Sequence, residues 1–229
     1  MQSSPPASRS VRSYVVRAGR MTVAQQRALE DLWPRYGIAF EGRPLDPRAL
    51  FDRFERCACR TLEIGFGNGD NLLARAQDEP ERDFLGIEVH PPGIGHLLLG
   101  AAAAQLTNLR VLAHDAAEVV MQLPAGCLEE IQVLFPDPWP KTRHHKRRLL
   151  QPDFIGTLAR VLQPGGRLHI ATDWRPYAEH IAQTLAGCEA LDAARLPQRV
   201  TSRRVTTRFE RRGARLGHDI HEFLFMRRA

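Results

Sequence analysis

The chain has few aromatic residues, almost no lysine and no long apolar run. Aromatic residues make up 7% of the sequence, and only 2 of the 32 basic residues are lysine. The longest apolar stretch, Leu97-Leu98-Leu99-Gly100 followed by four alanines, falls short of the roughly 18 apolar residues that a membrane-spanning helix needs. The first twenty residues also lack the apolar core of a secretory signal. We therefore expect a cytoplasmic protein with no membrane contact, although an arginine- and serine-rich, acid-poor start is also found in transit peptides.

Cysteine is scarce as well. The four cysteines are at positions 57, 59, 127 and 188, and no two pairs have the spacing of a zinc site. A single Cys-x-Cys without a second cluster favours reduced, buried thiols over a metal centre. We expect no metal.

Positive charge is concentrated near the two ends of the chain. The formal net charge is +6, yet residues 195–229 hold ten arginines and three acids, and residues 1–20 hold four arginines and no acid. Such tails are candidate contacts for a polyanion. A genomic bias toward arginine and an ordinary solvated face are the competing explanations.

Short apolar runs alternate with helical patterns from residue 60 onward. Strands are expected at 61–64, 84–88, 109–112, 131–135, 166–172 and 220–226, and helices at 71–76 and 154–162. A further helix over 21–33 should stop at Pro34 and Gly37, and Pro164-Gly165-Gly166 should form a turn before the next strand. This alternation predicts a parallel α/β sheet covered on both faces. The expected organisation is a flexible basic arm, residues 1–20, and a single domain, residues 21–229.

A glycine-rich loop follows the first predicted strand in Gly65-Phe66-Gly67-Asn68-Gly69-Asp70. Open α/β sheets bind ligands at the carboxyl ends of their strands. A dinucleotide fingerprint requires glycine where this chain has Asp70. A carboxylate at a helix N-terminus repels a pyrophosphate, so the loop favours a ligand without phosphates. S-adenosyl-L-methionine, with its adenine, ribose diol, sulfonium and amino acid end, fits better than a nicotinamide cofactor.

Two further acids follow successive strands on the same edge. Glu88 closes the second strand, 25 residues after Glu63, where an acid can accept hydrogen bonds from both ribose hydroxyls. Asp115 follows the third strand and could accept one from the adenine amino group. An acid at a strand end is often only a helix cap, but three in register favour a methyl-donor site.

A proline-rich corner, Phe135-Pro136-Asp137-Pro138-Trp139-Pro140-Lys141, follows the fourth predicted strand. Each proline fixes its own φ and pushes the preceding residue toward an extended conformation, so we expect Asp137 and Trp139 to have little backbone freedom. Residues 141–148 then contain five Lys or Arg and no acid, which suits phosphate contacts. The corner predicts a carboxylate over the ligand crevice beside a nucleic-acid contact; a simple helix cap is the alternative.

The sequence resembles the bacterial tRNA guanine-N7 methyltransferases of the TrmB type over nearly its whole length. Besides the proline corner, the motifs that carry the resemblance are Arg12-Ser13-Tyr14-Val15-Val16-Arg17, Trp33-Pro34, Leu62-Glu63-Ile64-Gly65-Phe66-Gly67, Gly86-Ile87-Glu88-Val89-His90, Ala171-Thr172-Asp173-Trp174, Thr207-Arg208-Phe209-Glu210 and Arg215-Leu216-Gly217-His218. The resemblance implies a Rossmann-like class I SAM-dependent methyltransferase with a mostly parallel seven-stranded sheet flanked by helices. It also implies methyl transfer from S-adenosyl-L-methionine to N7 of a guanosine in the tRNA variable loop, at tRNA position 46, to give 7-methylguanosine.

The resemblance implies roles for individual residues, with Asp137 as the catalytic residue. The cofactor-binding residues would be Glu63, Gly65, Gly67, Asn68, Glu88, Asp115, Ala116 and Asp137. The substrate-binding residues would be Lys141, Asp173, Thr207, Arg208, Phe209 and Glu210. The RNA contacts would be Arg143, His144, His145, Lys146, Arg147 and Arg148. The expected partner is tRNA, no role transfers to the tip of the arm, and both monomers and homodimers occur among such enzymes.

Three other functions compete with this interpretation. A methyltransferase acting on a protein or a small metabolite remains possible, although the basic tail and cluster argue against it. An RNA-binding protein with a vestigial pocket should have lost acids at 63, 88, 115 or 137, and all four are present. A nicotinamide enzyme is disfavoured by Asp70.

Overall fold

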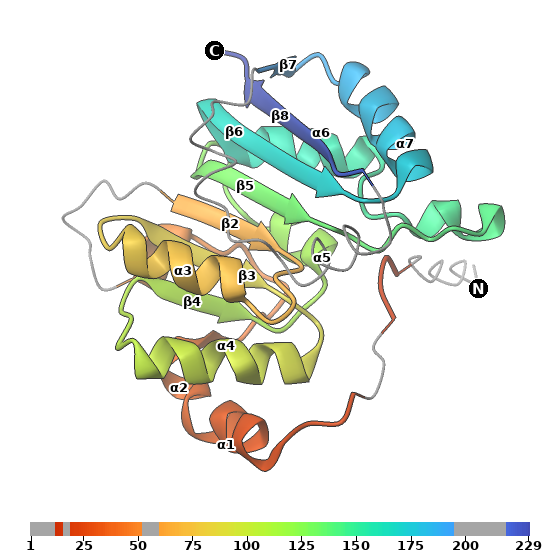
Figure 1. The fold of residues 1–229 in the computed structure, drawn as a ribbon. Coiled ribbons are helices and arrows are strands. Elements are labelled where there is room, and N and C mark those ends of the chain that lie inside the picture. Colours follow the sequence, from red (N-terminus) through yellow and green to blue (C-terminus); the bar gives the residue numbers. More distant parts are fainter. Residues whose placement is uncertain (1–11, 16–18, 52–59, 195–218) are drawn as a thin grey trace, which may run out of the picture.

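The computed structural model describes residues 12–15, 19–51, 60–194 and 219–229. Within these residues one sheet has the strand order β1-β4-β3-β2-β5-β6-β8-β7 (Figure 1). Its strands are β1 (Gly37–Ile38), β2 (Arg60–Ile64), β3 (Asp83–Ile87), β4 (Leu109–Leu112), β5 (Leu128–Leu134), β6 (Leu162–Thr172), β7 (Leu191–Ala193) and β8 (His221–Arg227). All pairings from β1 to β6 are parallel, and β8 is antiparallel to both β6 and β7. The carboxyl ends of β2 to β6 therefore share one edge.

Helices cover both faces of this sheet. The first face is covered by α1 (Val23–Asp31), α2 (Trp33–Tyr36), α3 (Asp70–Asp78) and α4 (Pro91–Ala103). The second is covered by α5 (Ala116–Met121), α6 (Pro152–Val161) and α7 (Arg175–Ala186). Two short 3-10 helices, η1 (Pro47–Leu50) and η2 (Thr142–Arg147), lie in connections. No helix in the described ranges is both long enough and apolar enough to cross a membrane.

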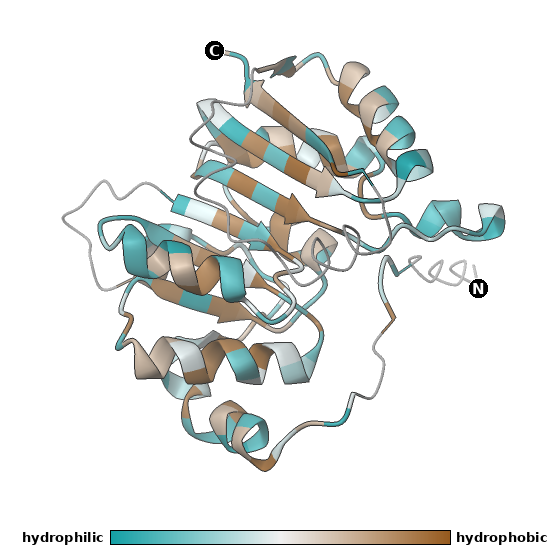
Figure 2. Ribbon diagram, in the orientation of Figure 1, coloured by the Kyte–Doolittle hydropathy of each residue, from teal (hydrophilic) through white to brown (hydrophobic). Residues whose placement is uncertain are grey.

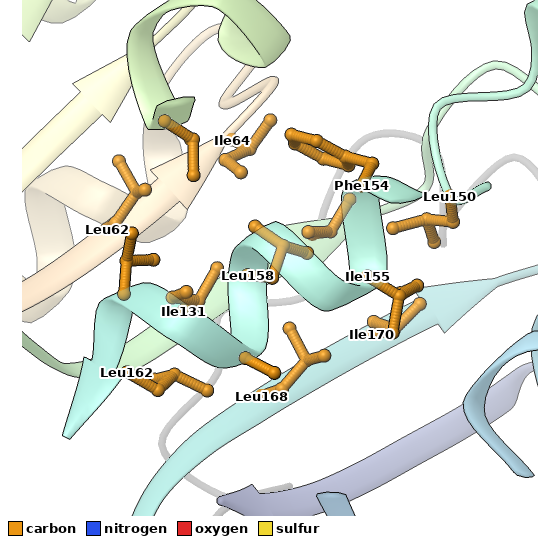
Figure 3. Close-up of a cluster of buried hydrophobic side chains, with 14 of the residues drawn as sticks. Leu62, Ile64, Ile131, Leu150, Phe154, Ile155, Leu158, Leu162, Leu168 and Ile170 are labelled. Carbon is orange, nitrogen blue, oxygen red and sulfur yellow. The ribbon is translucent and has the colours of Figure 1, made fainter. Parts of the chain in front are cut away.

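The larger core lies between the sheet and the second layer of helices. Leu62 of β2, Ile131 of β5 and Leu168 of β6 stand in one row across three strands. Each is fully buried, and Leu158 of α6 belongs to the same cluster (Figure 3). Burial of this apolar surface, at about 25 cal/mol per Å², is the main force that holds the layers together.

The opposite face of the same strands carries a polar row. Glu63 of β2, Gln132 of β5 and His169 of β6 are in register, one residue after the apolar row. Side chains alternate between faces along a strand, and the hydrophilic segments that interrupt β5 and β6 are visible in Figure 2. All three polar residues are buried, so the sheet brings ionisable groups beneath the glycine loop.

The predicted α/β class and the mostly parallel sheet are confirmed, but the sheet has eight strands in the described residues instead of the seven expected. Two strands lie outside the ranges expected from the sequence: β1, a two-residue strand beside β4, and β7, a three-residue strand beside β8. The helix expected over 21–33 is divided, since α1 ends at Asp31 and a second helix ends before its C-cap Gly37, as expected. Pro34 lies in the first turn of α2, where the missing N–H has no partner to lose. The strand predicted from residue 166 begins at Leu162, and its pairing with β5 shifts register across Pro164-Gly165-Gly166.

Candidate active site

The glycine loop between β2 and α3 leaves open space next to its backbone. Gly65, Gly67 and Gly69 all have positive φ, at 70°, 59° and 80°, a region that residues with a side chain rarely occupy. Gly65 is exposed at the carboxyl end of β2, and a Cβ placed there would meet no atom within 4 Å. A ligand can therefore approach the main chain closely here, as the predicted methyl donor requires.

Helix α4 supports the loop from behind. A Cβ at Gly93, in the first turn of α4, would lie 2.1 Å from the carbonyl oxygen of Gly67. Nδ1 of His96 lies 2.9 Å from the carbonyl oxygen of Asn68 and donates to it in the corresponding tautomer. The helix thus fixes the main chain at two of the predicted cofactor residues, and the exposed side of the loop remains open.

Glu88 ties the loop to the end of β3. Its Oε2 accepts from the Gly67 N–H at 2.8 Å, while Oε1 accepts from the N–H groups of Val89 and His90 at 2.7 and 3.0 Å. A carboxylate has about four acceptor sites. In this geometry three of those sites are taken by N–H groups of the protein, and the carboxylate fixes the loop against the end of β3.

Asp115 caps α5 at the end of β4. Its Oδ1 accepts from the Ala117 N–H at 2.9 Å, and Ala116 is the first helical residue. The ring of Phe40 lies 4.6 Å from that of His114, the residue before Asp115. The cap is compatible with contact to an adenine amino group, because the second carboxylate oxygen takes no part in it.

Glu63 lies beneath the loop rather than on its open side. The side chain is 3% exposed and accepts from Nδ2 of Asn71 at 2.8 Å. The same Nδ2 donates to Oε1 of Gln132 at 2.9 Å. Burial is the main cause that raises the pKa of Glu63, to about 7. In this arrangement Glu63 fixes the position of α3 under the loop.

We expect Glu63→Gln to stabilise the protein at high pH only. The raised pKa means that the folded protein holds a proton which the unfolded chain releases, so stability falls as pH rises from about 4.5 to 7 and stays lower above it. The neutral amide should raise the free energy of unfolding by on the order of 3 kcal/mol at pH 8 and by less than about 1 kcal/mol at pH 5. Urea denaturation at the two pH values measures both, and an equal effect at both would contradict the raised pKa.

The proline corner after β5 has a strained backbone. Phe135 and Trp139 have φ values of 54° and 45°, so the expected extended conformation is wrong for Trp139. Such conformations cost of order 1–3 kcal/mol each and persist where surrounding contacts hold them. The Phe135 N–H donates to Ala171 of β6 at 2.8 Å, and Trp139 is held through its indole, as described below. Asp137, between them, is exposed at the carboxyl edge of the sheet.

The cationic run after the corner divides into two groups. Lys141, Arg143 and Lys146 are exposed, and His144 and His145 are partly exposed, all in or beside η2. Arg148 is only 4% exposed; it donates to the carbonyl of Pro138 at 3.0 Å and lies over the Tyr177 ring at 5.0 Å. Burial of this kind does not fit the expected RNA contact, and Arg148 instead supports the corner.

The remaining predicted residues lie at the edge of the described structure or outside it. Asp173 directly follows β6 and is partly buried. The N-cap position of α7 is occupied by Trp174, whose side chain makes no capping hydrogen bond, and Asp173 is the residue directly before it. Thr207, Arg208, Phe209 and Glu210 lie outside the described residues, as do Cys57 and Cys59. Within the described part of the chain, no group of three or more His, Cys, Asp or Glu could hold a metal ion.

The sheet topology, the open glycine loop and the acids that follow β3 and β4 define a class I SAM-dependent methyltransferase. Two solved structures share the fold. The 16S rRNA methyltransferase KamB matches with a TM-score of 0.54 and 20% identity over 94% of this chain and 99% of its own. TrmN from Thermus thermophilus matches with a TM-score of 0.54 and 17% identity over 89% of this chain and 48% of its own.

Comparison of sequences identifies the family. Residues 58–223 match the family described as "Putative methyltransferase". Proteins named tRNA (guanine-N(7)-)-methyltransferase are 50% identical in Alkalilimnicola ehrlichii, over 96% of this chain and 94% of the relative, and 51% identical in Nitrosococcus oceani, over 96% and 92%. The chain belongs to the bacterial tRNA (guanine-N7-)-methyltransferase family.

Proposed function

We infer that this protein transfers the methyl group of S-adenosyl-L-methionine to N7 of a guanosine in tRNA. The observation that carries this conclusion is the 50% identity, over 96% of the chain, to a relative named for that reaction. The site agrees with it, because an open glycine loop, three acids at strand ends and an exposed cationic group share one edge of the sheet. We further propose that the target is the variable-loop guanosine at tRNA position 46 and that the enzyme works in the bacterial cytoplasm, where its substrate is found.

The proposed reaction needs little acid–base catalysis from the protein. The methyl donor supplies an electrophilic methyl on a sulfonium, and guanine N7 has a free lone pair at neutral pH, so no proton must leave first. Positive charge develops on the purine during transfer, and the carboxylate of Asp137 can stabilise it or fix the base through its Watson–Crick edge. Most of the acceleration then comes from positioning, which suits a corner whose backbone is held in place.

The direct test is incubation of the protein with unmodified tRNA and labelled methyl donor, followed by nucleoside analysis. Label should appear in 7-methylguanosine alone. A tRNA transcript with adenosine at position 46 is the matched control and should take up no label. Label in any other nucleoside would contradict the proposed reaction, whereas 7-methylguanosine at another position would contradict only the proposed target.

The exposed cations should contribute the salt-dependent part of tRNA affinity. Each phosphate contact releases counterions, so its loss reduces the slope of log K against log salt by about 0.7–0.9. We expect Arg143→Ala with Lys146→Ala to weaken tRNA binding at low salt and to reduce that slope by about 1.4–1.8. Arg48→Ala, which removes an exposed arginine paired with Asp46, is the control and should leave the slope unchanged. An unaltered slope in the double variant would remove both residues from the RNA contacts.

A further inference from the structure

A short N-terminal segment lies on the proline corner. Residues 12–14 contact it through main-chain carbonyls: Nε1 of Trp139 donates to Ser13 at 3.0 Å, and Arg147 donates from Nε to Arg12 at 3.1 Å and from Nη2 to Tyr14 at 3.4 Å. In Figure 1 this segment, in red, runs beside the green segment that follows β5. More than 120 residues separate the partners in the sequence.

Arg147 is the centre of this contact. Its guanidinium lies over the Trp139 ring, with Cζ 4.1 Å from the ring centroid, while one edge of the guanidinium reaches two carbonyls that are two residues apart. The planar guanidinium group can stack on an aromatic ring and donate hydrogen bonds from one edge at the same time, which the ammonium group of lysine cannot do. The ring face and that edge are therefore engaged within the protein rather than turned toward RNA.

The same segment reaches toward the end of β4. The negative charge of Asp115 raises the pKa of Tyr14, second only to partial burial of the phenol, and Glu118 acts in the same direction. Tyr14 thus lies near the start of α5. In the sheet β3 and β2 separate β4 from β5. Gly19, a few residues further along the chain, lies against His90 and Pro92, which closely follow Glu88. Residues 12–14 and Gly19 therefore both lie along the edge that carries Glu88 and the glycine loop.

We propose that Arg147 is a positioning residue that fastens residues 12–14 across this edge, enclosing the bound methyl donor beside Asp137. The identity of the enclosed cofactor rests on the proposed function. The contact between Arg147 and residues 12–14 does not depend on it. Trp139 completes the fastening, and its left-handed backbone, with a φ of 45°, orients the indole toward the segment. The motif from Arg12 to Arg17 thereby gains a role for its first three residues.

The variant Arg147→Ala tests the fastening without relying on catalysis. Trypsin cleavage of the full-length protein after Arg12, followed by mass spectrometry, should become about 10-fold faster, because two hydrogen bonds and a cation–π contact are lost. Calorimetry with S-adenosylhomocysteine should show an affinity weaker by about 10-fold. The KM for S-adenosyl-L-methionine should rise in proportion, while the salt slope of tRNA binding stays at its wild-type value. Arg147→Lys should recover only part of each loss.

Two further variants separate this role from the alternatives. Trp139→Phe keeps a ring beneath the guanidinium and removes only the indole donor, so cleavage after Arg12 should accelerate by a few-fold. Arg143→Ala is the matched control in the same cationic run; it should reduce the salt slope and leave cleavage after Arg12 unchanged.

The opposite pattern overturns the proposal. If Arg147→Ala leaves cleavage and S-adenosylhomocysteine affinity at wild-type values but reduces the salt slope by about one, Arg147 is an RNA contact. If Arg147→Ala also loses thermal stability, the test rests on Trp139→Phe. A wild-type rate of cleavage after Arg12 in Trp139→Phe would then overturn the proposal. A wild-type protein that methylates no tRNA would contradict the proposed function alone, because the cleavage rates do not depend on it.

Discussion

Replacing Asp137 with alanine should abolish methyl transfer and leave tRNA binding almost intact. Asp137 is exposed at the carboxyl edge of the sheet, just before the exposed cations in the sequence. Loss of one preorganised electrostatic group typically lowers kcat by about 10²–10³. Single-turnover methylation measures the chemical step, and filter binding measures tRNA affinity on the same preparation. Equal loss of transfer and binding would exclude a catalytic role for Asp137.

Asp137→Asn is the informative control for this experiment. The amide keeps the size of the side chain and one hydrogen-bond acceptor but has no charge. If charge stabilisation dominates, the asparagine variant should be as inactive as the alanine variant. If Asp137 mainly fixes the base through hydrogen bonds, asparagine should recover a measurable part of the rate. The two variants therefore distinguish the two proposed roles of one residue.

The placement of the glycine loop and two acids at the carboxyl edge of the sheet was predictable, because the sequence signals for it are local. A glycine loop after an apolar run, followed by acids at the ends of the next two runs, needs only strand periodicity and the rule that parallel strands share a carboxyl edge. The structure places Gly65, Glu88 and Asp115 at that edge. The side-chain orientation of Glu63 was not predictable in the same way, because its contact with Asn71 depends on how α3 packs beneath the loop.

The features that the sequence did not predict depend on tertiary contacts. Helix α4 begins with Pro91-Pro92-Gly93, which resembles a turn, and it is stabilised by packing against α1 and α3. Charge density alone could not separate buried Arg148 from exposed Arg143, because only the fold places a carbonyl and the Tyr177 ring beside the former. The left-handed backbone at Trp139 likewise reflects partners distant in the sequence, which override the local effect of the following proline.

Replacing Arg75 with leucine should strongly destabilise the fold. The guanidinium of Arg75 is buried between α3 and the sheet face that carries Glu63. It donates to Oε1 and Oε2 of Glu130 at 2.7 and 3.3 Å and to Oε1 of Glu79 at 3.0 Å. Burial raises the pKa of Glu130, but the charge and hydrogen bonds of Arg75 outweigh it and hold that pKa below its ordinary value. Without Arg75 a carboxylate stays buried with much less compensation, which typically costs about 3–5 kcal/mol. Urea denaturation at pH 7 measures this loss.

The pH dependence and two control variants identify the cause of that loss. Because the pKa of Glu130 is lowered in the folded protein, its contribution to stability is present above the carboxyl pKa of the unfolded chain and is lost as pH falls. The difference in free energy of unfolding between wild type and Arg75→Leu should therefore narrow in acid. Adding Glu130→Leu should recover part of the stability, because no buried charge is then left without its main partner. Arg175→Leu breaks an exposed pair with Glu179 and should cost less than about 1 kcal/mol. A similar small cost for Arg75→Leu would show that Glu130 is solvated in solution, and the Arg75–Glu130 pair would then contribute little to holding α3 beneath the glycine loop.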